Sequence, residues 1–126
     1  MDEDMRSWLR YAESDMISAE ALHRIGQELN AIFHLQQAVE KTLKALYTKQ
    51  NPTMPPRLHD LRELASGCRL QLTRQQSRLL QDLSSAYIDS RYPEQWGGGP
   101  PEVPADQTAE LIVESKDFIA WLKEKL

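Results

Sequence analysis

The sequence predicts an all-α fold, an up-and-down antiparallel bundle of four to five helices in a single domain. Apolar residues recur at helical spacing along most of the 126 residues, and no alternating β-branched stretch indicates a strand. Prolines cluster near residues 52–56 and 93–104, and three of the five glycines lie in the second cluster, so breaks between helices are few. Hydrophobic residues make up 40% and charged residues 27%, a balance typical of a folded globular domain.

The first two helices are predicted at roughly 4–25 and 28–50. Gly26 suits the end of the first helix, whose apolar stripe contains Trp8, Ala12, Ala19 and Leu22. The second helix ends at Asn51, because a residue that precedes proline avoids the helical conformation. Its apolar face is made by Leu29, Ile32, Phe33, Val39, Leu43, Leu46 and Tyr47.

Three further helices are predicted at roughly 58–68, 74–92 and 105–126. Asp60 followed by Glu63 resembles a capping box for the third helix, and Thr73 with Gln76 supplies a more regular one for the fourth. Pro104 suits the start of the fifth helix. Because most connections are short, neighbouring helices are expected to be antiparallel. Residues 1–126 therefore form one helical domain, with a flexible Gly/Pro loop at about 93–104.

Composition excludes several classes of protein. The net charge of −4 and the pI of about 5.4 disfavour a globally basic nucleic-acid binder, although a local basic patch stays open. A single cysteine, Cys68, excludes an internal disulfide, and His23, His34 and His59 are too scattered for a metal site, so we expect neither metal nor cofactor. The acidic first residues and the absence of an apolar run of about 20 residues predict a cytoplasmic protein without a membrane partner.

Four polar residues occupy stripes that are otherwise apolar: Asp15, Gln36, Glu40 and Arg91. A buried charge is costly unless it is paired, so we expect these side chains to meet one another or to line a wet cleft. Two other interpretations stay open. The residues can form a purely structural network, or they can lie at the edge of the stripe and reach water.

Lys41 and Lys44 are neighbours at helical spacing and, together with Arg91, are candidates for a small phosphate-binding site. The alternative is a solvated lysine face. Trp96 lies in the Gly/Pro loop, where an aromatic ring can stack on a nucleobase or pack back onto its own bundle.

Two stretches in the first half of the chain resemble motifs of a known family. Trp8, Ala12 and Asp15 resemble an opening W-x3-A-x2-D motif. The run from Phe33 to Ala45 resembles the signature F-x2-QQA-x-EK-x-LKA, which is the most specific part of the resemblance.

Two later stretches complete the resemblance. Residues 58–61 resemble the HDL motif that opens the third helix, and residues 87–93 resemble a Y-x3-RYP motif at the end of the fourth. The family is HEPN, the higher-eukaryote and prokaryote nucleotide-binding domain. The matches run from about residue 8 to residue 93 with compatible spacing throughout.

The resemblance implies a helical bundle that is often a homodimer and that acts on nucleotides or RNA. Many prokaryotic members are paired with a minimal nucleotidyltransferase as a toxin–antitoxin system, and some are metal-independent endoribonucleases with an R-x4-6-H motif. Arg91 matches the arginine of that motif, but the positions of the histidine hold Trp96, Gly97 and Gly98. Because phosphodiester cleavage needs a group that titrates near neutral pH, His59 from another helix is the remaining substitute.

We therefore expect a non-catalytic nucleotide- or RNA-binding module. Its expected partner is a second copy of itself, a nucleotidyltransferase, or both. The expected ligand-binding residues are Arg91, Tyr92, Trp96, Lys41 and Lys44. The expected supporting network consists of Asp15, Gln36 and Glu40. Two alternatives stay open: an endoribonuclease toxin with a non-standard base, for which Arg91 and His59 are the catalytic candidates, and a purely structural helical oligomerisation unit.

Overall fold

A computed structural model describes residues 3–51, 53–57, 60–91 and 102–126, with the backbone alone for 88–91. Every regular element in these residues is a helix, which confirms the predicted all-α bundle. The helices are α1 (Glu3–Arg24), α2 (Glu28–Gln50), α3 (Leu61–Gly67), α4 (Arg74–Arg91) and α5 (Ala105–Lys123).

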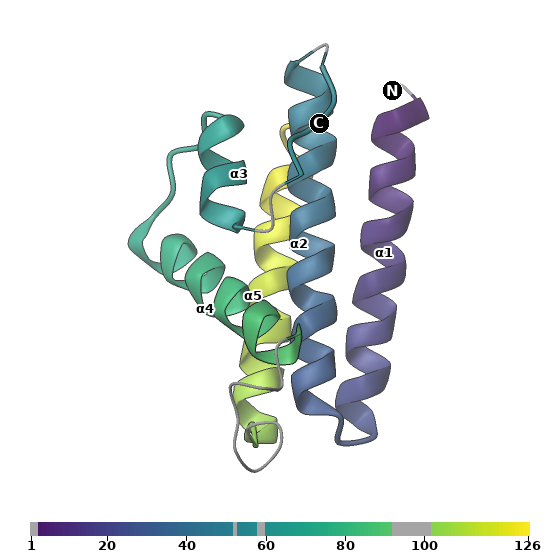
Figure 1. Ribbon diagram of the computed structural model, residues 1–126, viewed down its shortest axis with the longest axis vertical. Coiled ribbons are helices and arrows are strands. Elements are labelled where there is room, and N and C mark those ends of the chain that lie inside the picture. Colours follow the sequence, from purple (N-terminus) through teal and green to yellow (C-terminus); the bar gives the residue numbers. More distant parts are fainter. Residues whose placement is uncertain (1–2, 52, 58–59, 92–101) are drawn as a thin grey trace.

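The chain runs up and down the long axis of the bundle (Figure 1). Helices α1 and α2 form a long antiparallel hairpin. Helix α4 returns obliquely across the bundle, and α5 then runs beside α2 and in the same direction. The C-terminal ends of α2 and α5 meet, since the Lys49 ammonium donates to the carbonyl oxygens of Lys125 and Leu126, each at 2.9 Å.

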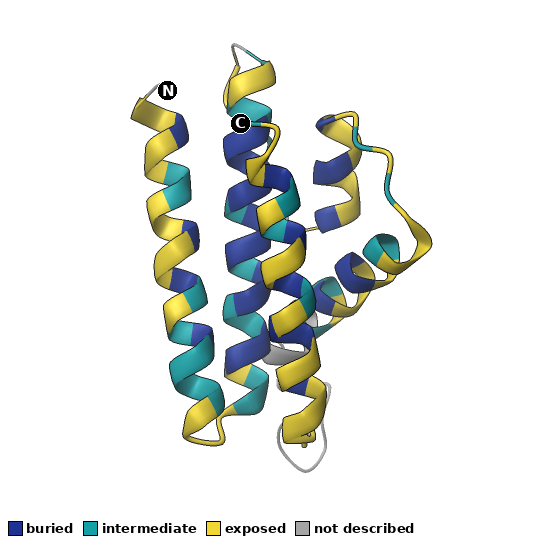
Figure 2. Cartoon of the chain, turned by 180° about the vertical axis from the view of Figure 1, so that it is seen from behind, coloured by how far each residue is buried: buried dark blue, intermediate teal, exposed yellow. Residues whose placement is uncertain are grey.

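Helix α2 is the centre of the molecule and contacts each of the other four helices. Figure 2 shows buried positions along almost its whole length. The sequence predicts one apolar face for this helix, but the structure buries residues on nearly all of its sides, including Ala31, Ala38 and Ala45 at seven-residue spacing. Alanine's small side chain lets a neighbouring helix approach closely, so a helix packed on every side need not carry large apolar residues all round.

Side-chain caps define the starts of α3 and α4. The Asp60 carboxylate accepts from the backbone amides of Arg62 and Glu63 at 3.0 and 3.4 Å, so α3 begins at Leu61 and not at residue 58. Thr73 and Gln76 form the predicted capping box. The Thr73 amide donates to Gln76 Oε1 at 2.9 Å, and the Gln76 amide donates to Thr73 Oγ1 at 3.1 Å.

The remaining helix ends also follow local chemistry. Gly26 has a φ of +80° in the turn between α1 and α2, a conformation that costs a glycine little. Pro104 is the N-cap residue of α5. Helix α5 ends at Lys123, three residues before the predicted end. No helix in the described part of the chain is long and apolar enough to cross a membrane.

Candidate functional site

Asp15 is the centre of a polar cluster between α1 and α2. It is 8% exposed and lies on the buried stripe of α1 between Ala12 and Ala19. Its Oδ1 lies 2.9 Å from His34 Nδ1, and its Oδ2 accepts a hydrogen bond from Lys41 Nζ at 2.5 Å. One carboxylate of α1 thus holds two side chains that are two turns apart on α2. These three residues are called the Asp15 cluster.

A second cluster, the Glu40 cluster, lies within α2 and consists of Gln36, Glu40 and Lys44. Gln36 Nε2 donates to Glu40 Oε1 at 3.2 Å, and Lys44 Nζ donates to Glu40 Oε2 at 3.2 Å. Gln37 Nε2 extends the chain of hydrogen bonds by donating to Gln36 Oε1 at 2.7 Å. Gln36, Glu40 and Lys44 are all buried, so the Glu40 cluster lies in the interior of the bundle. Within the described part of the chain, the hydrogen bonds of Asp15 go to His34 and Lys41 and not to Gln36 or Glu40.

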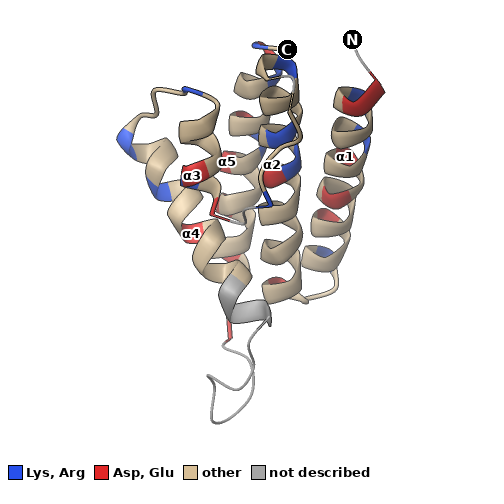
Figure 3. Ribbon diagram, turned by 45° about the horizontal axis from the view of Figure 1, so that its top comes forward, with Lys and Arg blue, Asp and Glu red and all other residues tan. Residues whose placement is uncertain are grey.

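Aromatic rings of α1 cover both lysines. Lys44 Nζ lies 5.3 Å from the centroid of the Trp8 ring, and Lys41 Nζ lies 5.7 Å from that of Tyr11. Each ammonium is therefore held between a carboxylate and a ring, and Figure 3 shows acidic and basic segments following one another along α2. Lys44 is only 8% exposed, so it is not part of a solvated lysine face.

Four predicted site residues are not placed by the structure. The side chain of Arg91, and all of His59, Tyr92 and Trp96, lie outside the described residues, so their roles stay predictions. The backbone of α4 continues to Arg91, which therefore belongs to its last turn.

Helix α4 is fixed against the first half of α2. The rings of Tyr87 and Phe33 lie 5.7 Å apart, and the Phe33 ring also meets the edge of the His34 ring at 5.2 Å. Tyr87 is one helical turn before Arg91. The Phe33–Tyr87 contact lies just before His34 and Gln36, the first α2 residues of the two polar clusters. The last turn of α4 comes immediately after this contact.

His34 is the site residue that the sequence interpretation missed. Nineteen residues separate it from Asp15, and only the register of the α1–α2 hairpin brings the two side chains together. Its side chain is 32% exposed, so part of the ring is open to solvent. Among the described residues, no group of three or more His, Cys, Asp or Glu side chains is arranged to hold a metal ion.

Comparison with known proteins identifies the family. The model of the HEPN domain matches residues 5–125, whereas no curated protein matches the chain. The crystal structure of TT1696 from Thermus thermophilus has a TM-score of 0.86 at 24% identity, covering 99% of this chain and 100% of that one. The crystal structure of ST0689, an archaeal HEPN homologue, has a TM-score of 0.72 at 27% identity and covers 99% and 98%. With the family model matched over nearly its whole length, the chain belongs to the HEPN domain family.

Proposed function

We propose that this chain is a non-catalytic nucleotide- or RNA-binding module of the cytoplasm. It acts as a homodimer, or it pairs with a minimal nucleotidyltransferase as in a toxin–antitoxin system, or it does both. Arg91 holds a phosphate group, Tyr92 and Trp96 stack on bases, and Asp15 and Glu40 position the neighbouring cations.

The observation that carries the proposal is a pair of lysines on α2 that are each held by a carboxylate. Lys41 and Lys44 are fixed by Asp15 and Glu40, at 2.5 and 3.2 Å. Helix α4 packs on the preceding turns of α2 and ends at Arg91. Fixed cations lose little conformational freedom when an anion arrives, which supports a role of these lysines in binding phosphate.

The cations are not equivalent in this proposal. Lys41 and Lys44 each have a carboxylate partner within the chain, so their charge is already compensated. The guanidinium of Arg91 also offers paired donors that match a phosphate. We therefore expect Arg91 to contribute more to ligand binding than either lysine does.

Binding without cleavage follows from the residues after Arg91. The endoribonucleases of the family use a histidine four to six residues beyond the arginine, and this chain has Trp96, Gly97 and Gly98 there. Neither indole nor glycine can exchange a proton near neutral pH.

Calorimetric titration with nucleoside triphosphates and with a short single-stranded RNA tests the proposal. We expect binding that weakens as salt is added, because phosphate contacts release counterions. Arg91→Ala should weaken binding about tenfold or more. Arg74→Ala is the matched control, since it removes an exposed arginine from the opposite end of the same helix. Equal affinities of wild type and Arg91→Ala would refute the role of Arg91.

The same titrations separate the proposal from a purely structural oligomerisation unit. In a structural unit, Glu40→Gln lowers the stability of the fold, and neither RNA nor nucleotide binds to any variant. Sedimentation of the wild type measures self-association, and co-purification with a nucleotidyltransferase encoded beside the gene measures the other partnership.

An endoribonuclease is the second candidate, and the Asp15–His34 contact favours it. A carboxylate that accepts from one ring nitrogen of a histidine leaves the other nitrogen for proton transfer. Incubation of the purified protein with a structured RNA tests this function. Cleavage that disappears in His34→Gln but persists in His23→Gln would support it, and intact RNA at high protein concentration would exclude it.

A further inference from the structure

Helices α4 and α5 enclose a groove that has no part in the site described above. Two cavities of about 270 and 420 Å³ lie between these helices, and they share Gln75, Leu79 and Glu114, so they form one continuous groove. It follows α5 from Gln107 to Trp121, a length of about 21 Å at the helical rise of about 1.5 Å per residue. About six residues of an extended chain span this distance. This feature is called the α4–α5 groove.

The floor of the α4–α5 groove is apolar. Leu79, Leu111 and Phe118 lie beneath it, and each is at most 7% exposed. The half-buried Trp121 forms one end of the groove, and its ring lies 5.6 Å from that of Phe118. A long side chain with an aliphatic stem and a cationic head can pack on such a ring. Lys125 of the same chain illustrates this contact, since its ammonium lies 4.5 Å from the centroid of the Trp121 ring.

Acidic side chains line the groove around this floor. They are Asp82, Glu110, Glu114 and Asp117. Arg78 is the one basic residue among the described residues that line it. Four carboxylates and one guanidinium leave a formal charge of −3. No ion pair joins any of these carboxylates to another residue in the part of the chain that the structure describes.

The negative charge of the groove is poorly compensated within the chain. Burial raises the pKa of Glu114, and repulsion from Glu110 and Asp82 raises it further, although Arg78 acts in the opposite direction. A bound cation would relieve this repulsion. A nucleic acid would increase it, because its phosphates are negative. The complement of the groove is therefore positively charged.

The spacing of the carboxylates favours a chain of cations over a single ion. Glu110, Glu114 and Asp117 follow one another at about one helical turn, with separations along the helix axis of about 6 and 4.5 Å. They are thus spread along the groove, and among the described residues no group of acidic, histidine or cysteine side chains is arranged to hold a metal ion. In an extended peptide, alternate side chains lie on the same side at intervals of about 6.6 Å. Basic residues at alternate positions therefore suit this row.

We propose that the α4–α5 groove binds a basic segment of a partner protein, an extended chain with arginine or lysine at alternate positions. The cationic heads pair with the carboxylates of α5, and one aliphatic stem packs on Trp121. The side-chain amides of Gln75 and Gln107 also line the groove, and an amide both donates to and accepts from a peptide backbone. A linear polyamine has no carbonyl groups that could accept from them. The inference goes beyond the proposed function, because it needs neither a nucleotide nor Arg91.

Calorimetric titration with the peptide RARARAR, capped at both ends, tests the proposal. This peptide should bind the wild type, and a capped EAEAEAE peptide should not, because its charges have the same sign as the groove. A groove variant that combines Glu110→Gln, Glu114→Gln and Asp117→Asn should bind RARARAR about tenfold more weakly, since each ion pair at a surface contributes little by itself. The three changes keep the shape of each side chain, and helical circular dichroism checks that the variant is folded.

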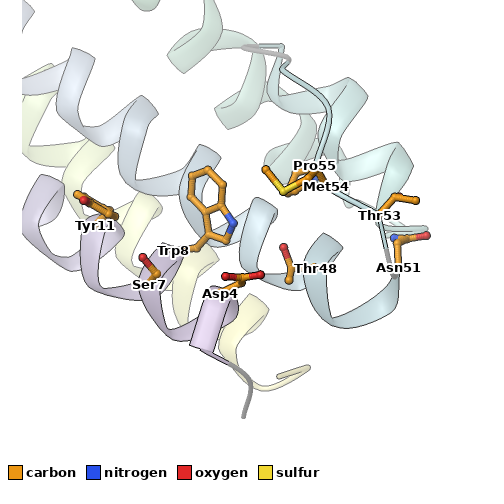
Figure 4. A pocket seen from close by; sticks show the side chains of 9 residues that line it. All are labelled: Asp4, Ser7, Trp8, Tyr11, Thr48, Asn51, Thr53, Met54 and Pro55. Carbon is orange, nitrogen blue, oxygen red and sulfur yellow. The ribbon is translucent and has the colours of Figure 1, made fainter.

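The matched control removes the same number of charges from α1. It combines Glu3→Gln, Asp4→Asn and Glu13→Gln, and it should bind RARARAR like the wild type. Asp4 lines a separate pocket together with Trp8 and Met54 (Figure 4). The control variant therefore reports how far net charge alone affects the binding of the peptide.

Three further titrations complete the design. Spermine carries as many positive charges as RARARAR and should bind more weakly, because it has no peptide backbone. Gln75→Ala combined with Gln107→Ala should weaken the binding of RARARAR but not that of spermine. Arg91→Ala should bind the peptide like the wild type, which separates a failure of the groove from a failure of the phosphate site. The proposal is overturned by absent RARARAR binding at millimolar concentration, by equal affinities of the groove variant and the control variant, or by spermine that binds as tightly as the peptide.

Discussion

Glu40 and Lys44 illustrate how a buried ion pair depends on both of its members. Their side chains are 4% and 10% exposed, and 3.2 Å separates Nζ from Oε2. Removing the lysine leaves a carboxylate in the interior with less compensation, and such a loss costs more than the intact pair contributes. We expect Lys44→Met to lower the free energy of unfolding by about 3 kcal/mol in urea titrations.

A double variant provides the control for this prediction. Lys44→Met combined with Glu40→Leu removes both charges, so it should recover a large part of the lost stability. If Lys44→Met unfolds at the same urea concentration as the wild type, the pair is not a structural element of the bundle.

Cys68 is a core thiol with low reactivity. It is 1% exposed, and its thiol donates to the Leu43 carbonyl at 3.4 Å. Burial raises the pKa of Cys68 from its ordinary value of 9.0 to about 11. Little thiolate is therefore present at pH 8, and the folded protein should react with a disulfide reagent far more slowly than the protein in urea does.

The same pKa shift predicts how stability depends on pH. The folded state keeps its proton up to about pH 11, whereas the unfolded chain loses it from about pH 9. The contribution of Cys68 is complete below pH 9 and is lost as the pH rises toward 11. Cys68→Ala should reduce the loss of stability over this range, and equal slopes in the two proteins would contradict the assignment.

The site residues show how far the sequence predicts contacts. Asp15, Gln36 and Glu40 are identifiable because polar residues on an apolar stripe need partners, and each has one in the structure. The partnership of Asp15 with His34 is not predicted. The pattern within one helix reports which side is buried, but not which residue of the next helix lies opposite.

At the scale of an element, the capping box of α4 gives a direct test. The Thr73 hydroxyl and the Gln76 amide oxygen each accept from the other residue's backbone amide. Thr73→Ala should lower the free energy of unfolding by about 1 kcal/mol. Because the two bonds are reciprocal, Thr73→Ala and Gln76→Ala should not be additive in a double-mutant cycle. Additive effects would show that the two bonds act separately.

Helix boundaries are predicted well where a side chain or a special backbone residue marks them. Gly26, Asn51 and the Thr73–Gln76 pair place three helix ends within one residue of those in the structure. The predicted start of α3 is too early, although Asp60 is recognisable as a capping residue, because apolar spacing continues to Leu58. The burial of α2 on all sides is not predicted, since the number of helices around it depends on tertiary packing and not on its own pattern.

At the scale of the whole molecule, the fold class follows from the positions of the helix-breaking prolines and glycines along the chain. Few breaks and short connections leave little choice but an antiparallel bundle. The oblique course of α4 has no comparable signal, because it depends on which ridges of α2 it packs against. The position of Arg91 depends on that course, so the sequence alone identifies the arginine but not its surroundings.

The central place of α2 predicts that the chain unfolds as one unit. Every other helix packs on α2, so none keeps its main apolar contacts once α2 is lost. Leu43, which is fully buried on α2, therefore supports the whole domain.

Leu43→Ala should lower the free energy of unfolding by about 2–5 kcal/mol. In both proteins, helical circular dichroism and tryptophan fluorescence should report a single midpoint in urea, because Trp8 on α1 and Trp121 on α5 belong to two different helices that both pack on α2. Tyr11→Ala on exposed α1 surface should leave that midpoint nearly unchanged. Separate midpoints for the two signals would mean that the α1–α2 hairpin is stable without the other helices.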